Sequence, residues 1–219
     1  MKICGREIKA VIFDLDGTLL DSTNIWEKID IKFFAARNMK VPATYAEDIA
    51  HIGLTEAAKL TIEKYGIKAS IEEILQEWRD LSLHQYLYEV KLKPYAYELI
   101  LKLKKENVKM AVATANDRAL YEPCLKRLGI YDFFDTIEDV EKVKAGKNSV
   151  KLYNHVADIL KEKPENIAVF EDISVGLKTA FENGYLSIAV YDEHSKKDDE
   201  LKRKYSHLFI NSFKEILWR

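Results

Sequence analysis

Short runs of apolar residues alternate along this chain with longer segments in which apolar and polar residues are mixed. Runs of this length are typical of strands that are buried on both faces. Four such runs lie at residues 10–13, 108–113, 167–170 and 187–190. The segments between them repeat their apolar residues at helical spacing, so strands and helices are expected to alternate. This pattern predicts an α/β fold in which helices cover both sides of a parallel sheet.

One long segment, residues 22–90, breaks this alternation. It has no convincing strand pattern, and three amphipathic stretches within it predict helices. These stretches are residues 25–37, 54–65 and 71–88. We therefore expect a strand-rich core domain that is split in sequence into residues 1–21 and 91–219, with an inserted helical domain at residues 22–90. Both connections to the insertion are expected to lie close together.

Composition narrows the range of partners. Of the 219 residues, 47% are hydrophobic and 32% are charged, as in ordinary soluble globular proteins. A net charge of -2 lacks the basic character that binding to nucleic acid requires. No apolar run approaches the ~18 residues of a membrane span, so we expect a cytoplasmic location and no membrane partner. Two cysteines, Cys4 and Cys124, are too few for a disulfide scaffold.

Two carboxylates follow the first predicted strand. Asp14 and Asp16 are two residues apart, so in an extended chain their side chains project to the same side. They would lie beyond the carboxyl end of the strand, where open α/β sheets bind ligands. Gly17 permits a sharp turn at this point. Because an isolated Asp-Leu-Asp-Gly segment is more often a plain turn, the pair needs support from elsewhere in the chain.

The ends of two later predicted strands supply that support. Thr114 and Asn116 follow the second strand, and Glu171 and Asp172 follow the third. Carboxylates from two strand ends would form an oxygen-rich site of the kind that Mg²⁺ prefers. Without a cation these like charges would repel each other. The sequence therefore predicts Mg²⁺ as a cofactor.

Three further features suit a phosphate group. The hydroxyl of Thr114 and the backbone N–H groups that open the helix after Asn116 are donors of the kind that bind phosphate. Helix capping explains Thr114 and Asn116 equally well. Lys147 precedes another predicted helix and would supply a positive charge to a transferring phosphoryl group. A lone lysine in such a position is usually a surface residue.

Four segments in this order resemble the motifs of the haloacid dehalogenase superfamily. They are FDLDGTLLDS, ATAN, the lysine of AGK, and FEDISVG. The resemblance spans the whole chain, and residues 22–90 are similar to the C1-type helical cap of subfamily I. It implies a Rossmann-like core of three layers with a parallel sheet, and a small inserted cap that is entirely helical.

The resemblance also implies a phosphatase mechanism. Asp14 would be the nucleophile that takes the phosphoryl group, and Asp16 would protonate the leaving oxygen and then activate water. Thr114, Asn116 and Lys147 would bind the phosphate. The expected product is inorganic phosphate released from an aspartyl-phosphate intermediate.

A metal site and a class of substrate are implied in the same way. Mg²⁺ would be bound by the Asp14 carboxylate, the Asp16 backbone carbonyl and Asp172, with Glu171 close by. The substrate would be a small phosphorylated metabolite. We expect the chain to act as a monomer or a weak dimer.

The third motif departs from the family pattern. It usually contains two prolines and an aspartate after the lysine, but here Lys147 is followed by Asn-Ser-Val-Lys. Ser149 is suited to cap the following helix, so we interpret the difference as a change in how the loop is held. The phosphate-binding lysine is therefore Lys147, with Lys151 as the alternative.

Two positions bear on the choice between hydrolysis and transfer. Relatives that resemble β-phosphoglucomutase share all four motifs, so a sugar-phosphate mutase is the alternative function. Those mutases typically carry a histidine where this chain has Trp26, and a basic residue where it has Glu56. Both differences favour a phosphatase. Asp16 argues against dehalogenation, because the true dehalogenases lack this second aspartate.

Substrate selection is expected to depend on the cap. By analogy, the cap residues nearest the cleft are Trp26, His51, Thr55, Glu56 and Lys59. Each also has a structural interpretation. Trp26 has helical spacing with Ile29 and Phe33, which is typical of a cap core, and a single histidine is more often a surface residue than a ligand.

Overall fold

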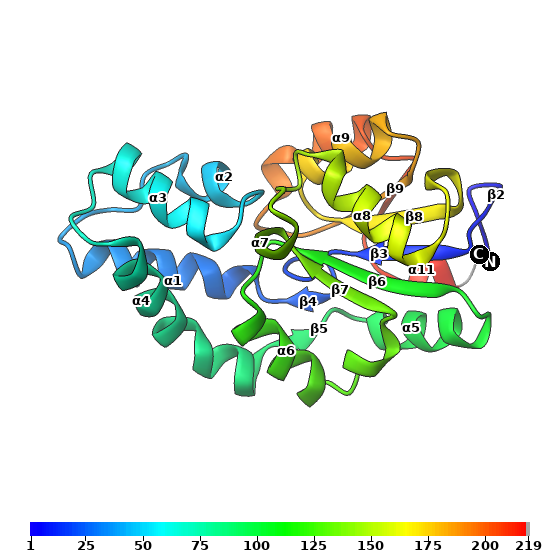
Figure 1. The fold of residues 1–219 in the computed structure, drawn as a ribbon, viewed down its shortest axis with the longest axis horizontal. Coiled ribbons are helices and arrows are strands. Elements are labelled where there is room, and N and C mark those ends of the chain that lie inside the picture. The colour runs from blue at the N-terminus through cyan, green and yellow to red at the C-terminus, as the bar shows by residue number, and fades with distance from the viewer. Residues whose placement is uncertain (218–219) are drawn as a thin grey trace.

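A six-stranded parallel sheet forms the centre of the larger part of the molecule (Figure 1). The structure is a computed structural model, and it describes residues 1–217. The strands are β3 (Ala10–Phe13), β6 (Lys109–Thr114), β7 (Thr136–Asp139), β8 (Ile167–Glu171), β9 (Leu186–Val190) and β10 (Leu208–Ile210). Their order across the sheet is β10-β9-β8-β3-β6-β7. The central position of β3, between β8 and β6, places its carboxyl end in the middle of the sheet edge.

Helices cover both sides of this sheet, as the sequence predicts. Along β3, Val11 and Phe13 belong to one core cluster, whereas Ala10 and Ile12 belong to another. This alternation follows from the two-residue period of a strand. The first cluster includes residues of α5 (Ala96–Lys105) and α6 (Arg118–Arg127), and the second includes residues of α8 (Val150–Leu160) and α9 (Ser174–Glu182). In Figure 1 these two pairs of helices lie below and above the sheet, which confirms the three-layer core.

Shorter elements complete this part of the chain. They are the hairpin of β1 (Lys2–Ile3) and β2 (Arg6–Glu7), the helices α7 (Val140–Val143), α10 (Asp199–Lys204) and α11 (Lys214–Leu217), and the 3₁₀ turns η2 (Tyr131–Phe133), η3 (Pro164–Asn166) and η4 (Lys196–Asp198). Among the described residues, none of the helices is both long enough and apolar enough to cross a lipid bilayer.

The four strands that the sequence predicts are all present, but two strands of the sheet were not predicted. These are β7 and β10, which lie at the two edges. β7 has the sequence Thr-Ile-Glu-Asp, and β10 has only three residues. An edge strand is covered less completely than a central one, so it does not need a continuous apolar run.

The helical insertion stands beside the sheet as a separate group (Figure 1). It consists of α1 (Thr23–Ala35), α2 (Tyr45–Ile49), α3 (Leu54–Tyr65), α4 (Ile71–His84) and the π-helical turn η1 (Gln85–Glu89). The chain enters it through β4 (Leu20–Asp21) and returns through β5 (Lys91–Leu92), which pair in antiparallel fashion. The two connections therefore lie side by side, as expected. The short helix α2 was not predicted.

A buried acid lies inside this helical group. Asp30 in α1 is only 7% exposed. Burial raises the pKa of Asp30 to about 7, and the negative charge of Glu27, one turn earlier, adds to the increase. Tyr45 lies close enough to feel the charge of Asp30, and its own pKa is raised above its usual range, mainly by burial. Because a neutral carboxyl group is favoured here, Asp30 makes the stability of the fold depend on pH.

We predict that Asp30→Asn stabilises the protein at alkaline pH. The pKa of Asp30 is higher in the folded state than in the unfolded state. The contribution of Asp30 to the free energy of unfolding is therefore fully present below about pH 4 and is lost as the pH rises through about 7. The difference in the free energy of unfolding between Asp30→Asn and the wild type should therefore shift by about 3 kcal/mol in favour of the variant from pH 5 to pH 8. Urea unfolding at several pH values measures this difference. The exposed Asp132→Asn is the control, and an Asp30→Asn curve parallel to the wild type would refute the prediction.

Candidate active site

The carboxyl ends of three adjacent strands bring the predicted site residues to one edge of the sheet. Asp14 directly follows β3, and its backbone N–H donates to the carbonyl of Phe170 in β8 at 3.0 Å. This bond continues the parallel ladder one residue beyond β3. Glu171 is the last residue of β8, and Thr114 is the last residue of β6. The topology therefore gathers residues that lie far apart in the sequence.

A buried lysine lies between two of these carboxylates. The Nζ atom of Lys147 is 2.6 Å from Oδ1 of Asp14 and 2.7 Å from Oε1 of Glu171. All three side chains are at most 4% exposed. Lys151, the alternative candidate, is exposed on the first turn of α8. Ser149 caps that helix, as expected, by accepting a hydrogen bond from the Lys151 backbone. The departures in the third motif therefore leave Lys147 at the sheet edge.

Three carboxylates share this site. Oxygen atoms of Asp14, Glu171 and Asp172 all lie within 4.8 Å of one another. Burial raises the pKa of Glu171 to about 7, and burial together with the charge of Glu171 raises the pKa of Asp172 well above its usual range. Burial lowers the pKa of Lys147, but the carboxylates of Asp14 and Glu171 outweigh it and raise that pKa well above its ordinary value. One ammonium group cannot neutralise three ionised carboxylates, so without a cation the buried cluster favours protonated forms of Glu171 and Asp172.

The donor set of this cluster fits a divalent cation. Within residues 1–217, Oδ2 of Asp14 is buried and has no hydrogen-bond partner. An acceptor atom buried without a donor is costly, and a cation would satisfy it. Three carboxylates gathered within 4.8 Å match the hard oxygen ligands that Mg²⁺ and Ca²⁺ prefer. The residues present are therefore compatible with the predicted metal site.

The chain around Glu171 and Asp172 holds both carboxylates in place. Thr18 donates to Oδ1 of Asp172 at 3.1 Å, and Oε2 of Glu171 accepts the backbone N–H of Asp172 at 2.8 Å. Gly176 approaches Glu171 so closely that a Cβ atom there would lie 2.4 Å from Oε1. Only glycine allows this approach, which explains the last residue of the segment FEDISVG.

Asp16 has a separate set of partners. Its Oδ1 accepts hydrogen bonds from the hydroxyls of Ser22 and Tyr86, and its Oδ2 accepts one from the side-chain amide of Asn116 at 2.8 Å. Burial raises the pKa of Asp16, whereas the three donors lower it. The indole N–H of Trp26 donates to the Tyr86 hydroxyl at 2.8 Å. Asp16 thus contacts residues of both the sheet edge and the helical insertion.

Two of these partners were missed by the sequence analysis. Ser22 lies within the first motif, so its distance of six residues from Asp16 is a signal that could have identified it. Tyr86 is separated from Asp16 by 70 residues. No motif or periodicity links it to that position, because only the folded insertion brings the two together.

The loop after β6 is bonded mostly to itself. Oγ1 of Thr114 accepts the backbone N–H of Asn116 at 3.1 Å, and Oδ1 of Asn116 accepts the N–H of Asp117 at 2.7 Å. Helix α6 begins after Asp117, whose carboxylate accepts the N–H of Ala119. The helix cap is therefore Asp117, and neither Thr114 nor Asn116 fills that role. The backbone N–H groups at the start of this helix, which were expected to be free for phosphate, donate to side chains of the loop instead. The side-chain amide of Asn116 donates to Asp16.

The candidate cap residues lie on or near the contact between the helical insertion and the sheet edge. The carbonyl of His51 accepts the backbone N–H of Lys147 at 3.0 Å, and the N–H of Thr55 donates to Glu141 at 2.8 Å. Both contacts use backbone atoms of the insertion. Glu56 and Lys59 are exposed on α3. In the described part of the chain, neither of these two side chains forms a hydrogen bond or ion pair.

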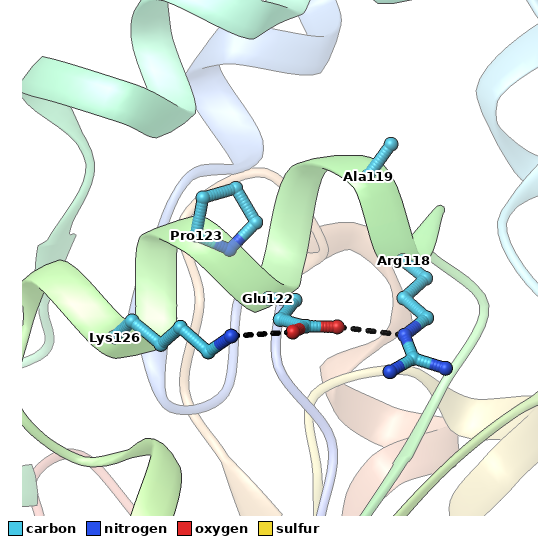
Figure 2. Close-up of a pocket in the computed structure, with 5 residues that line it drawn as sticks. All are labelled: Arg118, Ala119, Glu122, Pro123 and Lys126. Carbon is cyan, nitrogen blue, oxygen red and sulfur yellow. Dashed lines mark hydrogen bonds and ion pairs between the residues drawn. The ribbon is translucent and has the colours of Figure 1, made fainter.

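A surface hollow of about 420 Å³ is lined by residues of α6, and Figure 2 shows the side chains that line it. In it, Glu122 accepts from Arg118 at 2.7 Å and from Lys126 at 2.6 Å. The hollow contains none of the clustered carboxylates. Its charged groups are paired with one another along the helix surface, so it offers no chemistry comparable to that of the sheet edge.

Comparisons with known proteins agree with this arrangement. A family model described as "haloacid dehalogenase-like hydrolase" matches residues 8–184. The chain is 29% identical to a phosphorylated carbohydrates phosphatase of Thermotoga maritima, over 79% of this chain and 80% of that protein. It is also 29% identical to the β-phosphoglucomutase of Bacillus subtilis, over 84% and 83%. The crystal structure of CbbY from Rhodobacter sphaeroides in complex with phosphate has the same fold, with a TM-score of 0.82, 23% identity and coverage of 95% of this chain and 96% of that one.

We predict that Lys147→Met destabilises the protein in metal-free buffer by about 3 to 5 kcal/mol, because it leaves buried carboxylates without their counter-charge. Methionine keeps most of the side-chain length, so the charge is the main change. Denaturant unfolding in the presence of a chelator measures the loss. The control is Lys151→Met on the exposed surface, which should change stability by no more than about 0.5 kcal/mol. Equal effects of the two substitutions would contradict the pairing described above.

Proposed function

The chain belongs to the haloacid dehalogenase-like hydrolase family, and from this premise we propose that it is a Mg²⁺-dependent phosphatase of a small phosphorylated sugar or related metabolite. The observation that carries the proposal is the contact of the Lys147 ammonium with Asp14, beside a second Asp14 oxygen that is buried without a donor. This arrangement suits a carboxylate that attacks a phosphorus atom next to a fixed positive charge. The similarity to a phosphatase of phosphorylated carbohydrates supports the choice of substrate class.

In the proposed reaction, Asp14 and Asp16 divide the work. An oxygen of Asp14 attacks the phosphorus atom of the substrate, and the bond from phosphorus to the leaving oxygen breaks. Asp16 gives its proton to that oxygen, so the product leaves as an alcohol. Water then attacks the aspartyl phosphate and returns a proton to Asp16, which releases inorganic phosphate and restores Asp14. Two displacements of moderate difficulty thereby replace a single difficult one.

Lys147 and Thr114 are proposed to hold the phosphoryl group. The ammonium of Lys147 would offset charge on its oxygens, and the Thr114 hydroxyl lies at the end of the neighbouring strand β6. Asn116 is proposed to assist in a different way, because its amide bonds Asp16. Glu171 would keep Lys147 in position through their 2.7 Å ion pair.

The Asp14 carboxylate, the Asp16 backbone carbonyl and Asp172 are proposed to hold Mg²⁺, with Glu171 close by. When bound, the ion would neutralise charge on the phosphoryl oxygens. The cluster of three carboxylates and the unpartnered Asp14 oxygen support this assignment. Mg²⁺ usually retains several waters and binds through few carboxylates, which suits a site that must also admit a phosphate.

We propose that residues 22–90 act as a cap domain over a core of residues 1–21 and 91–219. The backbone contacts of His51 with Lys147 and of Thr55 with Glu141 support this role, because they bring the insertion directly over the strand ends. A cap in this place would exclude water and limit the size of the substrate. Trp26, His51, Thr55 and Glu56 remain the proposed specificity residues. We further propose that the enzyme works in the cytoplasm as a monomer or weak dimer.

A sugar-phosphate mutase is the second candidate, and the similarity to a β-phosphoglucomutase favours it. The surroundings of Trp26 argue for hydrolysis instead. Indole is only a donor, and the Trp26 N–H is already bonded to Tyr86. Trp26 therefore cannot exchange a proton with a second sugar hydroxyl, as an acid–base residue in that place could.

We predict that the wild type releases inorganic phosphate from sugar phosphates, that a chelator abolishes this activity and that added Mg²⁺ restores it. Asp14→Asn should lower the rate by roughly 10³-fold or more, because the nucleophile is lost. Asp132→Asn, an exposed carboxylate changed in the same way, is the control. Colorimetric phosphate release across a panel of phosphorylated metabolites measures these rates.

Two outcomes would redirect the proposal. Release that persists both in chelator and in Asp14→Asn would rule out the mechanism. Conversion of a sugar phosphate to its isomer, with little inorganic phosphate, would establish the mutase in place of the phosphatase.

A further inference from the structure

Tyr86 is a buried residue of the insertion that contacts the proposed acid–base carboxylate. Its side chain is 0% exposed, and its hydroxyl donates to Oδ1 of Asp16. The indole N–H of Trp26 donates to the same hydroxyl oxygen, and the two rings lie 6.2 Å apart. Since indole can only donate, the Tyr86 oxygen is the acceptor of that bond. The Tyr86 proton is therefore directed to Asp16.

The backbone of Tyr86 is fixed as well as its side chain. Tyr86 lies in the π-helical turn η1, through which the chain leaves the insertion. Arg127 of α6 donates to the carbonyl of Tyr86 at 3.2 Å and to that of Val90 at 2.5 Å. Single π-helical turns interrupt an otherwise regular helix and occur frequently at functional sites. Here the turn aims one aromatic hydroxyl at the sheet edge and is held there by the core.

The hydrogen bonds around Asp16 leave it little freedom. An ionised carboxylate accepts about four hydrogen bonds, and Ser22, Tyr86 and Asn116 supply three. About one acceptor position remains for a proton shared with a substrate. Asn116 comes from the loop after β6, and Ser22 from the point where the chain enters the insertion, directly after β4. Tyr86 comes from the turn through which the chain leaves the insertion. Without the Tyr86 hydroxyl, Oδ1 of Asp16 would lose one of its two hydrogen bonds, and the carboxyl group would be free to change its orientation.

We propose that Tyr86 is a positioning residue for Asp16, held in place by Trp26, and that it sets the direction in which Asp16 delivers a proton to the leaving oxygen. This inference rests on the proposed phosphatase function. The relevant bond change is the transfer of the Asp16 proton to the leaving oxygen as its bond to phosphorus breaks. Tyr86 itself keeps its proton and does not touch the substrate.

Leaving-group dependence separates this role from a purely structural one. A sugar alkoxide is a poor leaving group and needs the proton, whereas p-nitrophenolate leaves readily without it. The value of kcat/KM covers the steps up to the first irreversible bond cleavage, so it excludes the later attack of water on the aspartyl phosphate. Misplacing Asp16 should therefore lower kcat/KM for the sugar phosphate far more than for p-nitrophenyl phosphate.

The experiment compares both substrates in Tyr86→Phe, Trp26→Phe and the control Tyr88→Phe. Tyr88 lies in the same π-helical turn and is 68% exposed. We expect the ratio of kcat/KM for the sugar phosphate to that for p-nitrophenyl phosphate to fall about tenfold to a hundredfold in Tyr86→Phe, as a part of the ~10² to 10⁴ that positioned proton transfer supplies. A smaller fall is expected in Trp26→Phe, and none in Tyr88→Phe.

An unchanged ratio in Tyr86→Phe, or an equal loss with both substrates, would overturn the inference. If Tyr86→Phe does not fold, as judged by its thermal unfolding, Trp26→Phe decides the question by the same ratio. It removes the N–H that orients the Tyr86 hydroxyl, together with part of the indole ring, and leaves Tyr86 itself in place. Asp16→Asn is the reference. A selective loss in Asp16→Asn without one in the Tyr86 and Trp26 variants would refute the positioning role alone. A wild type that releases no phosphate, or an Asp16→Asn without selectivity, would refute the proposed function itself.

Discussion

The contact of the Lys147 ammonium with the carboxylates of Asp14 and Glu171 is the interaction on which the site depends. Burial makes isolated charges costly, so three carboxylates can share this edge only with compensation. Lys147 supplies part of it, at 2.6 and 2.7 Å from its two partners. The clustered carboxylates favour a divalent cation, and a transferring phosphoryl group needs both kinds of positive charge. A single electrostatic requirement thereby links stability, metal binding and the proposed chemistry.

The fold satisfies this requirement through its topology. Because β3 lies between β8 and β6, Asp14 stands beside the acids that end β8 and the polar residues that follow β6. The paired strands β4 and β5 then bring both ends of the helical insertion to the same edge. Contacts from the insertion reach Lys147 through the His51 carbonyl and Asp16 through Tyr86. The part of the molecule that is proposed to select substrates therefore touches the groups that are proposed to transform them.

Sequence patterns predicted the features that depend on local order. The central strands were recognised because they are continuous apolar runs, and Asp14, Glu171 and Asp172 because they follow those runs directly. The edge strand β7 was missed because it is polar, and the short helix α2 because five residues carry little periodicity. The link from Tyr86 to Asp16 depends on how the insertion packs. A contact over 70 residues leaves no local pattern, so only the folded chain reveals it.

Trapping the phosphorylated enzyme tests the central claim most directly. The protein is mixed with a sugar phosphate that it hydrolyses, quenched in acid during turnover, digested and mapped by mass spectrometry. The account predicts one phosphoryl group on the peptide that contains Asp14 in the wild type, and none in Asp14→Asn. Steady turnover with no phosphoryl group on Asp14 at any quench time would contradict the account.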